Sequence, residues 1–163
     1  MTSYTKLTDP LVGELLLVAN ETHLTGAYYA DAKNTPKPQK DWKLDPKHPV
    51  LGQATLQLKE YFRGERKKFT VPLFFEGTDF QRKIWKLVIE IPYGWAISYT
   101  DLAQKAGIPR ARRAVGTAVA KSRLEVFIPA HRVIAQDGGL GGFSGKWNRK
   151  KGLLELEGHS VDA

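Results

Sequence analysis

Residues 98–121 read SYTDLAQKAGIPRARRAVGTAVAK, and their pattern predicts two short helices in the second half of the chain. Ser98 precedes Asp101 at the spacing of a helix cap, which predicts a short helix. The triplet at residues 107–109, Gly-Ile-Pro, then turns the chain, and a second helix is expected over residues 110–121. Two short helices joined by a tight, glycine-containing turn form a helix-turn-helix.

The second of these helices has two different faces. Helical spacing predicts that its apolar residues are buried, namely Ala111, Ala114, Val115, Ala118 and Val119. The outer face then carries small residues and one arginine, namely Arg113, Gly116, Thr117 and Ala120. Small residues let a helix backbone approach a partner closely, and the arginine projects from among them. An exposed helix of an ordinary bundle shows the same pattern, so both interpretations stay open at this point.

The first half of the chain predicts a small α/β unit. Apolar runs at residues 11–18 and 23–30 predict two strands joined as a hairpin, and residues 69–75 predict a further strand. Apolar residues recur at helical spacing from Leu51, and this helix is expected to end near Gly64. Residues 31–47 contain three prolines and five lysines without an apolar period, which indicates a surface loop.

The second half predicts a mostly helical domain. Thr78 and Gln81 form a capping box for a helix that Pro92 ends. The apolar face of this helix consists of Phe80, Ile84, Leu87, Val88 and Ile91. The expected fold class is therefore an α/β N-terminal unit, with a small antiparallel sheet plus a helix, followed by a mostly α C-terminal domain with a winged helix-turn-helix. The expected domain bounds are 1–76 and 77–163.

The composition of the chain excludes several kinds of site. Its 163 residues, 42% of them hydrophobic, can form one compact domain or two small ones. It contains no cysteine, which excludes disulfides, thiolate metal sites and a thiol nucleophile. The four histidines are far apart and lack acidic partners at ligand spacing, so no metal is expected. The glycine-rich residues 138–145 match neither a phosphate loop nor a dinucleotide fingerprint, so no cofactor is expected.

The positive charge of the chain is concentrated in its second half. The net charge is +8; residues 1–81 carry 11 basic and 10 acidic side chains, and residues 82–163 carry 14 and 7. The two basic clusters are Lys105, Arg110, Arg112, Arg113, Lys121 and Arg123, and then Lys146, Arg149, Lys150 and Lys151. Beside a helix-turn-helix they indicate a nucleic-acid partner. No apolar run is long enough for a membrane span and no signal peptide is present, so we expect a cytoplasmic, nucleoid-associated protein.

Residues 128–134 read IPAHRVI and indicate a chemical site built around an unreactive residue. Pro129 fixes the backbone, His131 can take or give a proton, and Arg132 carries a charge, whereas Ala130 has no reactive group. A proline turn that enters a buried segment, with His131 as an ordinary core histidine, explains the same residues. The heptapeptide alone therefore does not decide between a site and a structural segment.

The segment Pro-Ala-His-Arg at residues 129–132 resembles the Pro-Cys-His-Arg active site of the O6-alkylguanine-DNA alkyltransferases, with the cysteine replaced by alanine. Further landmarks of that family follow in order and at its spacing, at residues 77–85, 91–94, 98–99, 113–116, 142–145 and 156–158. The first half is similar only in outline, through Asp-Pro-Leu-Val-Gly at residues 9–13 and a helix entered by His-Pro-Val at residues 48–50.

The resemblance implies a mechanism for the C-terminal domain. In active members, a cysteine at the position of Ala130 is deprotonated through the histidine at 131, a bridging water and the glutamate at 157, and then takes the alkyl group. The helix over residues 110–121 would lie in the minor groove, with Arg113 inserted into the base stack and Tyr99 rotating the phosphate. Glu157 can also be read as an ordinary carboxylate at a helix end.

Other site residues also come from the resemblance. The expected DNA-binding residues are Tyr99, Arg113, Ala114, Gly116, Ser122 and Arg132, of which Ala114 and Gly116 would allow close approach. The expected base pocket consists of Val133, Ile134, Phe143, Ser144 and Gly145. Ser122 replaces an asparagine that braces the recognition helix in the family, and Trp95 replaces a small or acidic residue. These two departures indicate relaxed catalytic demands.

Three functions are therefore compared. In the first, the protein resembles the natural alkyltransferase-like proteins: a monomer binds O6-alkylguanine in double-stranded DNA by base flipping, transfers nothing, and flags the lesion for nucleotide excision repair. In the second, it is a genuine methyltransferase whose cysteine was changed to alanine. In the third, it is a winged-helix regulator that reads sequence and ignores damage, although the outer helix face offers few side chains for base-edge hydrogen bonds. As written, the chain is no enzyme of this family, because it lacks the acceptor cysteine.

Overall fold

The computed structural model describes residues 1–135 and 148–159, and the chain divides into two compact units. The first unit comprises Met1–Glu76 with Arg123–Glu125, and the second comprises Gly77–Ser122 with Val126–Ala163. The expected bounds of 1–76 and 77–163 differ from these in residues 123–125. That short segment belongs to the first unit because Glu125 N–H donates to Ala27 O at 2.9 Å, and Ala27 N–H donates to Arg123 O at 2.7 Å.

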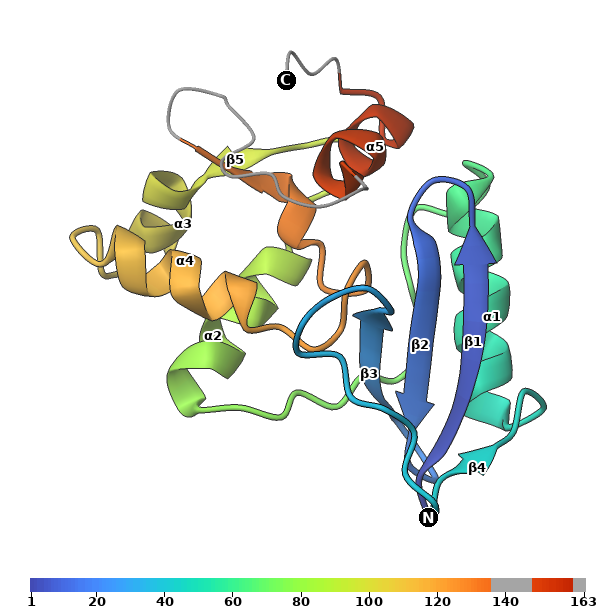
Figure 1. Ribbon diagram of the computed structural model, residues 1–163. Helices are drawn as coiled ribbons and strands as arrows, with labels where there is room; N and C mark the ends of the chain where they lie inside the picture. The colour runs from blue at the N-terminus through green and yellow to red at the C-terminus, as the bar shows by residue number, and fades with distance from the viewer. Residues whose placement is uncertain (136–147, 160–163) are drawn as a thin grey trace. The chain divides into compact units, whose positions relative to one another are not determined.

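The first unit is built on a four-stranded sheet with the order β3-β2-β1-β4 (Figure 1). The strands are β1 (Ser3–Asp9), β2 (Gly13–Ala19), β3 (Leu24–Tyr29) and β4 (Lys43–Leu44). β1 and β3 both pair antiparallel with β2, whereas β4 pairs parallel with β1. The hairpin predicted over residues 11–18 and 23–30 is confirmed as β2 and β3.

The structure of this unit differs from the sequence-based expectations at three places. β1 was not expected, because its buried positions include Ser3 and Thr5, which break the apolar alternation. The loop expected over residues 31–47 contains β4. The strand expected over residues 69–75 is reduced to an isolated bridge between Leu24 and Leu73, since Pro72 inside the run has no N–H to donate.

Helix α1 (Pro49–Phe62) covers one face of this sheet, as Figure 1 shows. Its buried face includes Leu51, Ala54, Leu58 and Tyr61, which confirms the predicted helical period. His48 caps the first turn, since its ring nitrogen accepts from Val50 N–H at 3.1 Å. The helix gives way to Gly64, whose φ of +77° is favourable only for glycine.

The second unit is mostly helical. Its helices are α2 (Asp79–Ile89), α3 (Tyr99–Lys105), α4 (Arg112–Ala120), the 3-10 turn η1 (Ala130–Arg132) and α5 (Arg149–Leu156). β5 (Ile97–Ser98) pairs parallel with β6 (Val133–Ile134). The capping box of Thr78 and Gln81 is confirmed, and Ser98 caps α3 by accepting from Asp101 N–H at 2.9 Å.

The helices of the second unit pack around a small apolar core. The buried side chains are Ile84, Trp85 and Val88 of α2, Leu102 and Ala103 of α3, and Val115, Ala118 and Val119 of α4. Trp85 Nε1–H donates to Ala118 O at 2.8 Å and so ties α2 to α4. The structure corrects three expectations for α4: the helix runs from Arg112 to Ala120, Ala111 is its half-buried N-cap, and Ala114 is exposed. Among the described residues, no helix is long and apolar enough to cross a membrane.

Candidate functional site

Ala130 opens the 3-10 turn η1 directly after Pro129. Its N–H donates to Ile128 O at 2.7 Å, and Arg132 N–H donates to Pro129 O at 2.9 Å, so the turn is closed by its own backbone. Ala130 is half-buried, whereas His131 and Arg132 are each only 6% exposed. The turn therefore presents a methyl group at a partly accessible position and buries the two charged or titratable side chains that follow.

Glu157 joins these two buried side chains to the end of helix α5. Its side chain is fully buried and accepts from His131 Nε2 at 2.7 Å. Arg132 donates to both carboxylate oxygens, from Nε at 2.8 Å and from Nη2 at 2.9 Å, and its Nη1 donates to Ile91 O at 2.7 Å. A bidentate arginine stabilises the charged carboxylate, so the pair stays ionised in the interior. Glu157 therefore differs from an ordinary carboxylate at a helix end, because it is buried and hydrogen bonded to both His131 and Arg132.

The protonation of His131 follows from its surroundings. Burial lowers the pKa of His131 below its ordinary value of 6.5, although the hydrogen bond and the charge of Glu157 act in the opposite direction. The ring is therefore neutral near pH 7. Because a carboxylate accepts hydrogen bonds only, the proton of this neutral ring lies on Nε2, which leaves the lone pair on Nδ1. In this tautomer His131 can act as a base.

The Tyr93-Gly94 segment, which the sequence marked only as part of a family landmark, completes the network. Gly94 N–H donates to Glu157 Oε1 at 3.3 Å. The φ of Gly94 is +84°, and a Cβ at this position would lie 3.3 Å from Glu157 O, so the close approach requires glycine. The guanidinium of Arg132 stands 5.7 Å from the centre of the Tyr93 ring. Burial and the neighbouring Glu157 charge raise the pKa of Tyr93.

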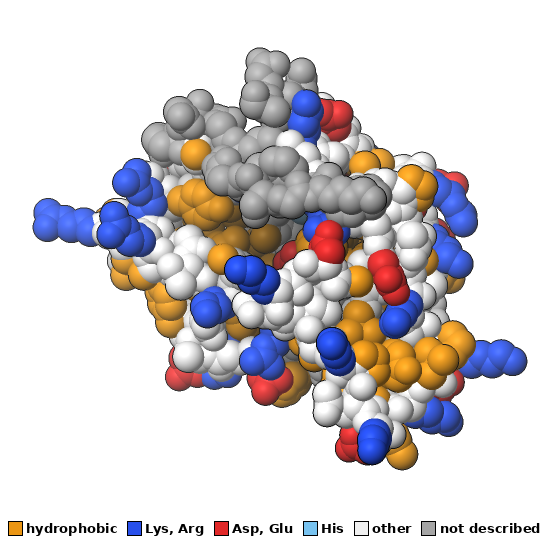
Figure 2. Space-filling view, in the orientation of Figure 1, with side chains coloured by type: hydrophobic (Ala, Val, Ile, Leu, Met, Phe, Trp, Pro, Cys, Tyr) orange, Lys and Arg blue, Asp and Glu red, His pale blue; other side chains and the backbone are white. Residues whose placement is uncertain are grey.

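The outer face of α4 carries exposed Arg113, Ala114, Thr117 and Ala120. Gly116 is half-buried, and a Cβ there would lie 3.6 Å from the ring of Tyr99, the first residue of α3. The ammonium of Lys150 stands 5.5 Å from the centre of the Tyr99 ring. Burial raises the pKa of Tyr99 and lowers that of Lys150. In Figure 2, basic side chains are spread over the visible face with fewer acidic ones among them.

The two units match the two domains of one protein family. Family models of the 6-O-methylguanine DNA methyltransferases match residues 3–75, as the ribonuclease-like domain, and residues 79–159, as the DNA binding domain. The chain belongs to this family. The match to both domains confirms the expected fold class, an α/β N-terminal unit followed by a helical DNA-binding domain.

Individual family members are similar over nearly their whole length. The constitutive methylated-DNA–protein-cysteine methyltransferase of Bacillus subtilis is 40% identical, over 96% of this chain and 96% of the relative. The crystal structure of Mycobacterium tuberculosis O6-methylguanine methyltransferase has a TM-score of 0.85 with 39% identity, covering 96% of this chain and 93% of that one. Mycobacterium tuberculosis OGT in complex with DNA has the same TM-score, with 38% identity, and covers 95% of this chain and 92% of that one.

Within the family framework, the structure brings together some expected site residues and separates others. His131 and Glu157 are hydrogen bonded to each other, and Ala130 precedes His131 in the 3-10 turn η1. Arg132, expected at the DNA, is instead buried against Glu157, because the carboxylate needs a charged partner in the interior. Val133 and Ile134 form β6. The remaining base-pocket residues lie outside the described residues, namely Phe143, Ser144 and Gly145.

The structure also gives the surroundings of Ser122 and Lys150. Ser122 follows the C-cap of α4, and its N–H donates to Val119 O at 3.3 Å. Lys150, which the sequence placed only in a basic cluster, lies near Tyr99 and lowers the pKa of His131 by its charge. No signal in the linear sequence pairs Lys150 with Tyr99, since fifty-one positions separate them. Among the described residues, no cluster of three or more His, Cys, Asp or Glu side chains could hold a metal ion.

Proposed function

We propose that this protein binds O6-alkylguanine in double-stranded DNA and does not transfer the alkyl group. The observation that carries the proposal is the complete hydrogen-bonded network of His131, Arg132 and Glu157 next to an alanine at position 130. This arrangement is suited to support a reactive residue at position 130, whereas the chain contains no cysteine. A methyl group has no lone pair with which to attack an alkyl carbon, so the site can hold a lesion without reacting.

The mode of DNA binding follows from the outer face of α4. Beyond the two exposed arginines of its first turn, Arg112 and Arg113, its exposed side chains are small, so the helix can approach the floor of a minor groove closely. Arg113 would enter the base stack in place of the extruded nucleotide, and Tyr99 would act on the phosphate beside it. The related Mycobacterium tuberculosis OGT has been crystallised in complex with DNA, which supports DNA as the partner.

The buried charges have a positioning role in this proposal. Arg132 bonds Glu157 and Ile91 O, and Glu157 also accepts from Gly94 N–H, so the carboxylate connects η1, α5 and the loop before β5. These contacts hold the 3-10 turn next to β6, whose residues Val133 and Ile134 would line the base pocket. The network therefore keeps the shape of the pocket even where no thiol needs activation.

The biological consequence we propose is that the bound protein flags the lesion for nucleotide excision repair. A protein that recognises damage without removing it has to pass the lesion to another system. We infer that it acts as a monomer in the cytoplasm, associated with the nucleoid, where its proposed binding partner, DNA, is found.

A second candidate function is a genuine methyltransferase in which cysteine was replaced by alanine. The specific observation in its favour is that His131 stands next to position 130 with Nε2 bonded to Glu157, an arrangement suited to deprotonate a thiol. The variant Ala130→Cys, incubated with a duplex carrying radiolabelled O6-methylguanine, tests this candidate. Transfer of label to the protein supports it, and absence of transfer from a folded variant counts against it.

The proposed function is tested by the affinity for two duplexes that are identical except for one O6-methylguanine, measured at fixed salt by fluorescence anisotropy. We expect the lesion duplex to bind at least about tenfold more tightly, since the alkylated base is held in a pocket as well as on the backbone. Equal affinities would overturn lesion recognition. A preference that follows sequence and ignores the lesion would instead support the winged-helix regulator.

A further inference from the structure

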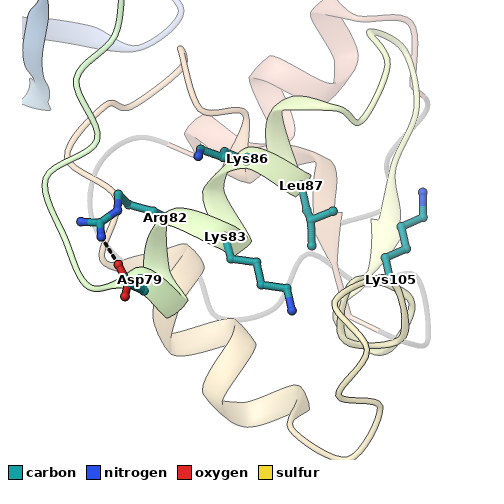
Figure 3. Close-up of a pocket in the computed structure, with 6 residues that line it drawn as sticks. All are labelled: Asp79, Arg82, Lys83, Lys86, Leu87 and Lys105. Carbon is teal, nitrogen blue, oxygen red and sulfur yellow. Dashed lines mark hydrogen bonds and ion pairs between the residues drawn. The ribbon is translucent and has the colours of Figure 1, made fainter.

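A basic pocket lies between helices α2 and α3 of the second unit. It is a hollow of about 400 Å³ lined by Asp79, Arg82, Lys83, Lys86, Leu87 and Lys105. In Figure 3, Lys83 and Leu87 extend from α2 toward the side on which Lys105 lies on α3. Arg82 and Lys86 extend to the other side of α2, so the hollow is lined by four cationic residues and a single carboxylate at different points of its rim.

The contacts within the pocket leave most of its positive charge unneutralised. Asp79 is paired with Arg82, which also donates to Gly77 O, so the one carboxylate is already used. Lys83 Nζ donates to Ala106 O at 2.8 Å, a contact that fixes this ammonium without cancelling its charge. In the part of the chain that the structure describes, Lys86 and Lys105 have no hydrogen bond or ion pair. Like charges that line one hollow repel each other, and an anion bound there would offset this repulsion.

Helix-end effects explain only part of this arrangement. Lys86 and Lys105 each lie in the last turn of their helix, where the helix dipole favours a cation. That effect accounts for each lysine separately. It does not explain why both lysines line the same hollow as Arg82 and Lys83. The apolar side chain of Leu87 also lines this hollow, and apolar surroundings strengthen interactions between charges.

The pocket lies on the side of α2 opposite to α4. Trp85 reaches α4 by donating to Ala118 O. Two positions along a helix differ in direction by about 200°, so Lys83 and Leu87, each two positions from Trp85, extend from nearly the opposite side of α2. A duplex bound to the outer face of α4 would therefore leave the pocket free.

We propose that this pocket binds a phosphate group, supplied either by the backbone of a second DNA segment or by a free phosphate ester. Lysine ammonium groups are compact point charges that suit phosphate oxygens, and the flexible side chains of Lys86 and Lys105 can adjust to either source. The DNA source rests on the DNA binding proposed above, whereas the affinity of the pocket for phosphate does not.

The first arm of the test titrates pyrophosphate into the full-length protein and into the double variant Lys86→Gln/Lys105→Gln, by isothermal titration calorimetry at low salt. The matched control is Lys37→Gln/Lys40→Gln, which removes the same charge from exposed positions of the first unit. We expect the pocket variant to bind about tenfold more weakly and the control to bind as the wild type does. Equal pyrophosphate affinity in all three proteins overturns the proposal.

The second arm distinguishes the two sources of phosphate. The protein is first saturated with a short duplex carrying O6-methylguanine, and a second, fluorescent, undamaged duplex is then added. A ternary complex that the pocket variant loses assigns the site to DNA; pyrophosphate binding without a ternary complex assigns it to a free phosphate ester. Binding of the lesion duplex is read separately in the first step, so failure of lesion recognition and failure of the pocket give different results.

Discussion

Glu157 accepts hydrogen bonds from His131, Arg132 and Gly94 while its own side chain is fully buried. The variant Glu157→Gln removes the negative charge and leaves the guanidinium of Arg132 buried without its counter-ion. We expect the free energy of unfolding to fall by about 3–5 kcal/mol, measured by urea denaturation.

The matched control for this variant is Glu155→Gln on the same helix. Glu155 is exposed and lies 3.9 Å from Lys151, so the control should change the free energy of unfolding by less than about 0.5 kcal/mol. If both variants lost the same stability, the buried network would not be what stabilises the end of α5.

The stability of the protein should also depend on pH through His131. Burial lowers its folded-state pKa below the ordinary 6.5, so between pH 6.5 and that lower value the unfolded chain binds a proton that the native state does not. The free energy of unfolding therefore has its full value, as far as His131 is concerned, above pH 6.5, and it decreases as the pH falls through this window. Urea denaturation at several pH values should show a smaller loss of stability on acidification in His131→Gln than in the wild type. Identical pH profiles would contradict a buried neutral histidine.

At the scale of elements, the loop between α2 and β5 depends on one glycine. The variant Gly94→Ala places a Cβ 3.3 Å from Glu157 O at a φ of +84° and should lower the free energy of unfolding by about 2 kcal/mol. Gly107→Ala is the control, since Gly107 has a similar φ of +79° but open space around its Cβ position. We expect the free energy of unfolding of the control to fall by only about 1 kcal/mol in the same assay. Equal decreases in the two variants would show that the contact with Glu157 O adds nothing to the cost of the backbone conformation.

Helices with a clear apolar period could be predicted from the sequence, whereas a strand whose buried positions include polar residues could not. α1 and the capped α2 follow from apolar spacing and the Thr78-Gln81 box, and both are observed. The buried face of β1 includes the polar residues Ser3 and Thr5, so the strand lacks the alternation of apolar and polar residues that would have predicted it. Ala114 was assigned to the buried face of α4, although the helix packs through a narrower stripe of Val115, Ala118 and Val119.

The candidate site was predictable where neighbouring residues form a motif, and unpredictable where distant residues meet. The segment at residues 129–132 and Glu157 were both identified, but the pairing of Arg132 with Glu157 was not, because a surface role for an arginine is the usual one. Gly94 and Lys150 act through contacts with residues about fifty or more positions away. Such contacts follow from packing in three dimensions and leave no periodic trace in the chain.

For the whole molecule, the excess of positive charge in residues 82–163 predicts that DNA affinity and lesion discrimination can be separated. Arg110→Ala removes an exposed cation near the start of α4 and should reduce the slope of log affinity against log salt by about 0.9, for damaged and undamaged duplexes alike.

Arg113→Ala carries the same change of charge and should act differently. We expect it to reduce the preference for the O6-methylguanine duplex, because the side chain that fills the base stack is lost, while the salt slope stays closer to that of the wild type. Anisotropy titrations over a range of salt concentrations measure both quantities. Equal effects of the two variants on lesion preference would contradict a special role for Arg113.

The three residues Arg123–Glu125 pair with Ala27 although the chain on either side of them belongs to the second unit. During synthesis the ribosome releases residues 1–76 long before residue 125. The backbone N–H and C=O of Ala27 therefore lack these hydrogen-bonding partners until more than half of the DNA-binding domain has been synthesised. Residues 1–76 alone therefore do not contain all of the N-terminal unit. A chain cut between residues 76 and 77 would separate Ala27 from the backbone groups of Arg123 and Glu125 to which it is hydrogen bonded.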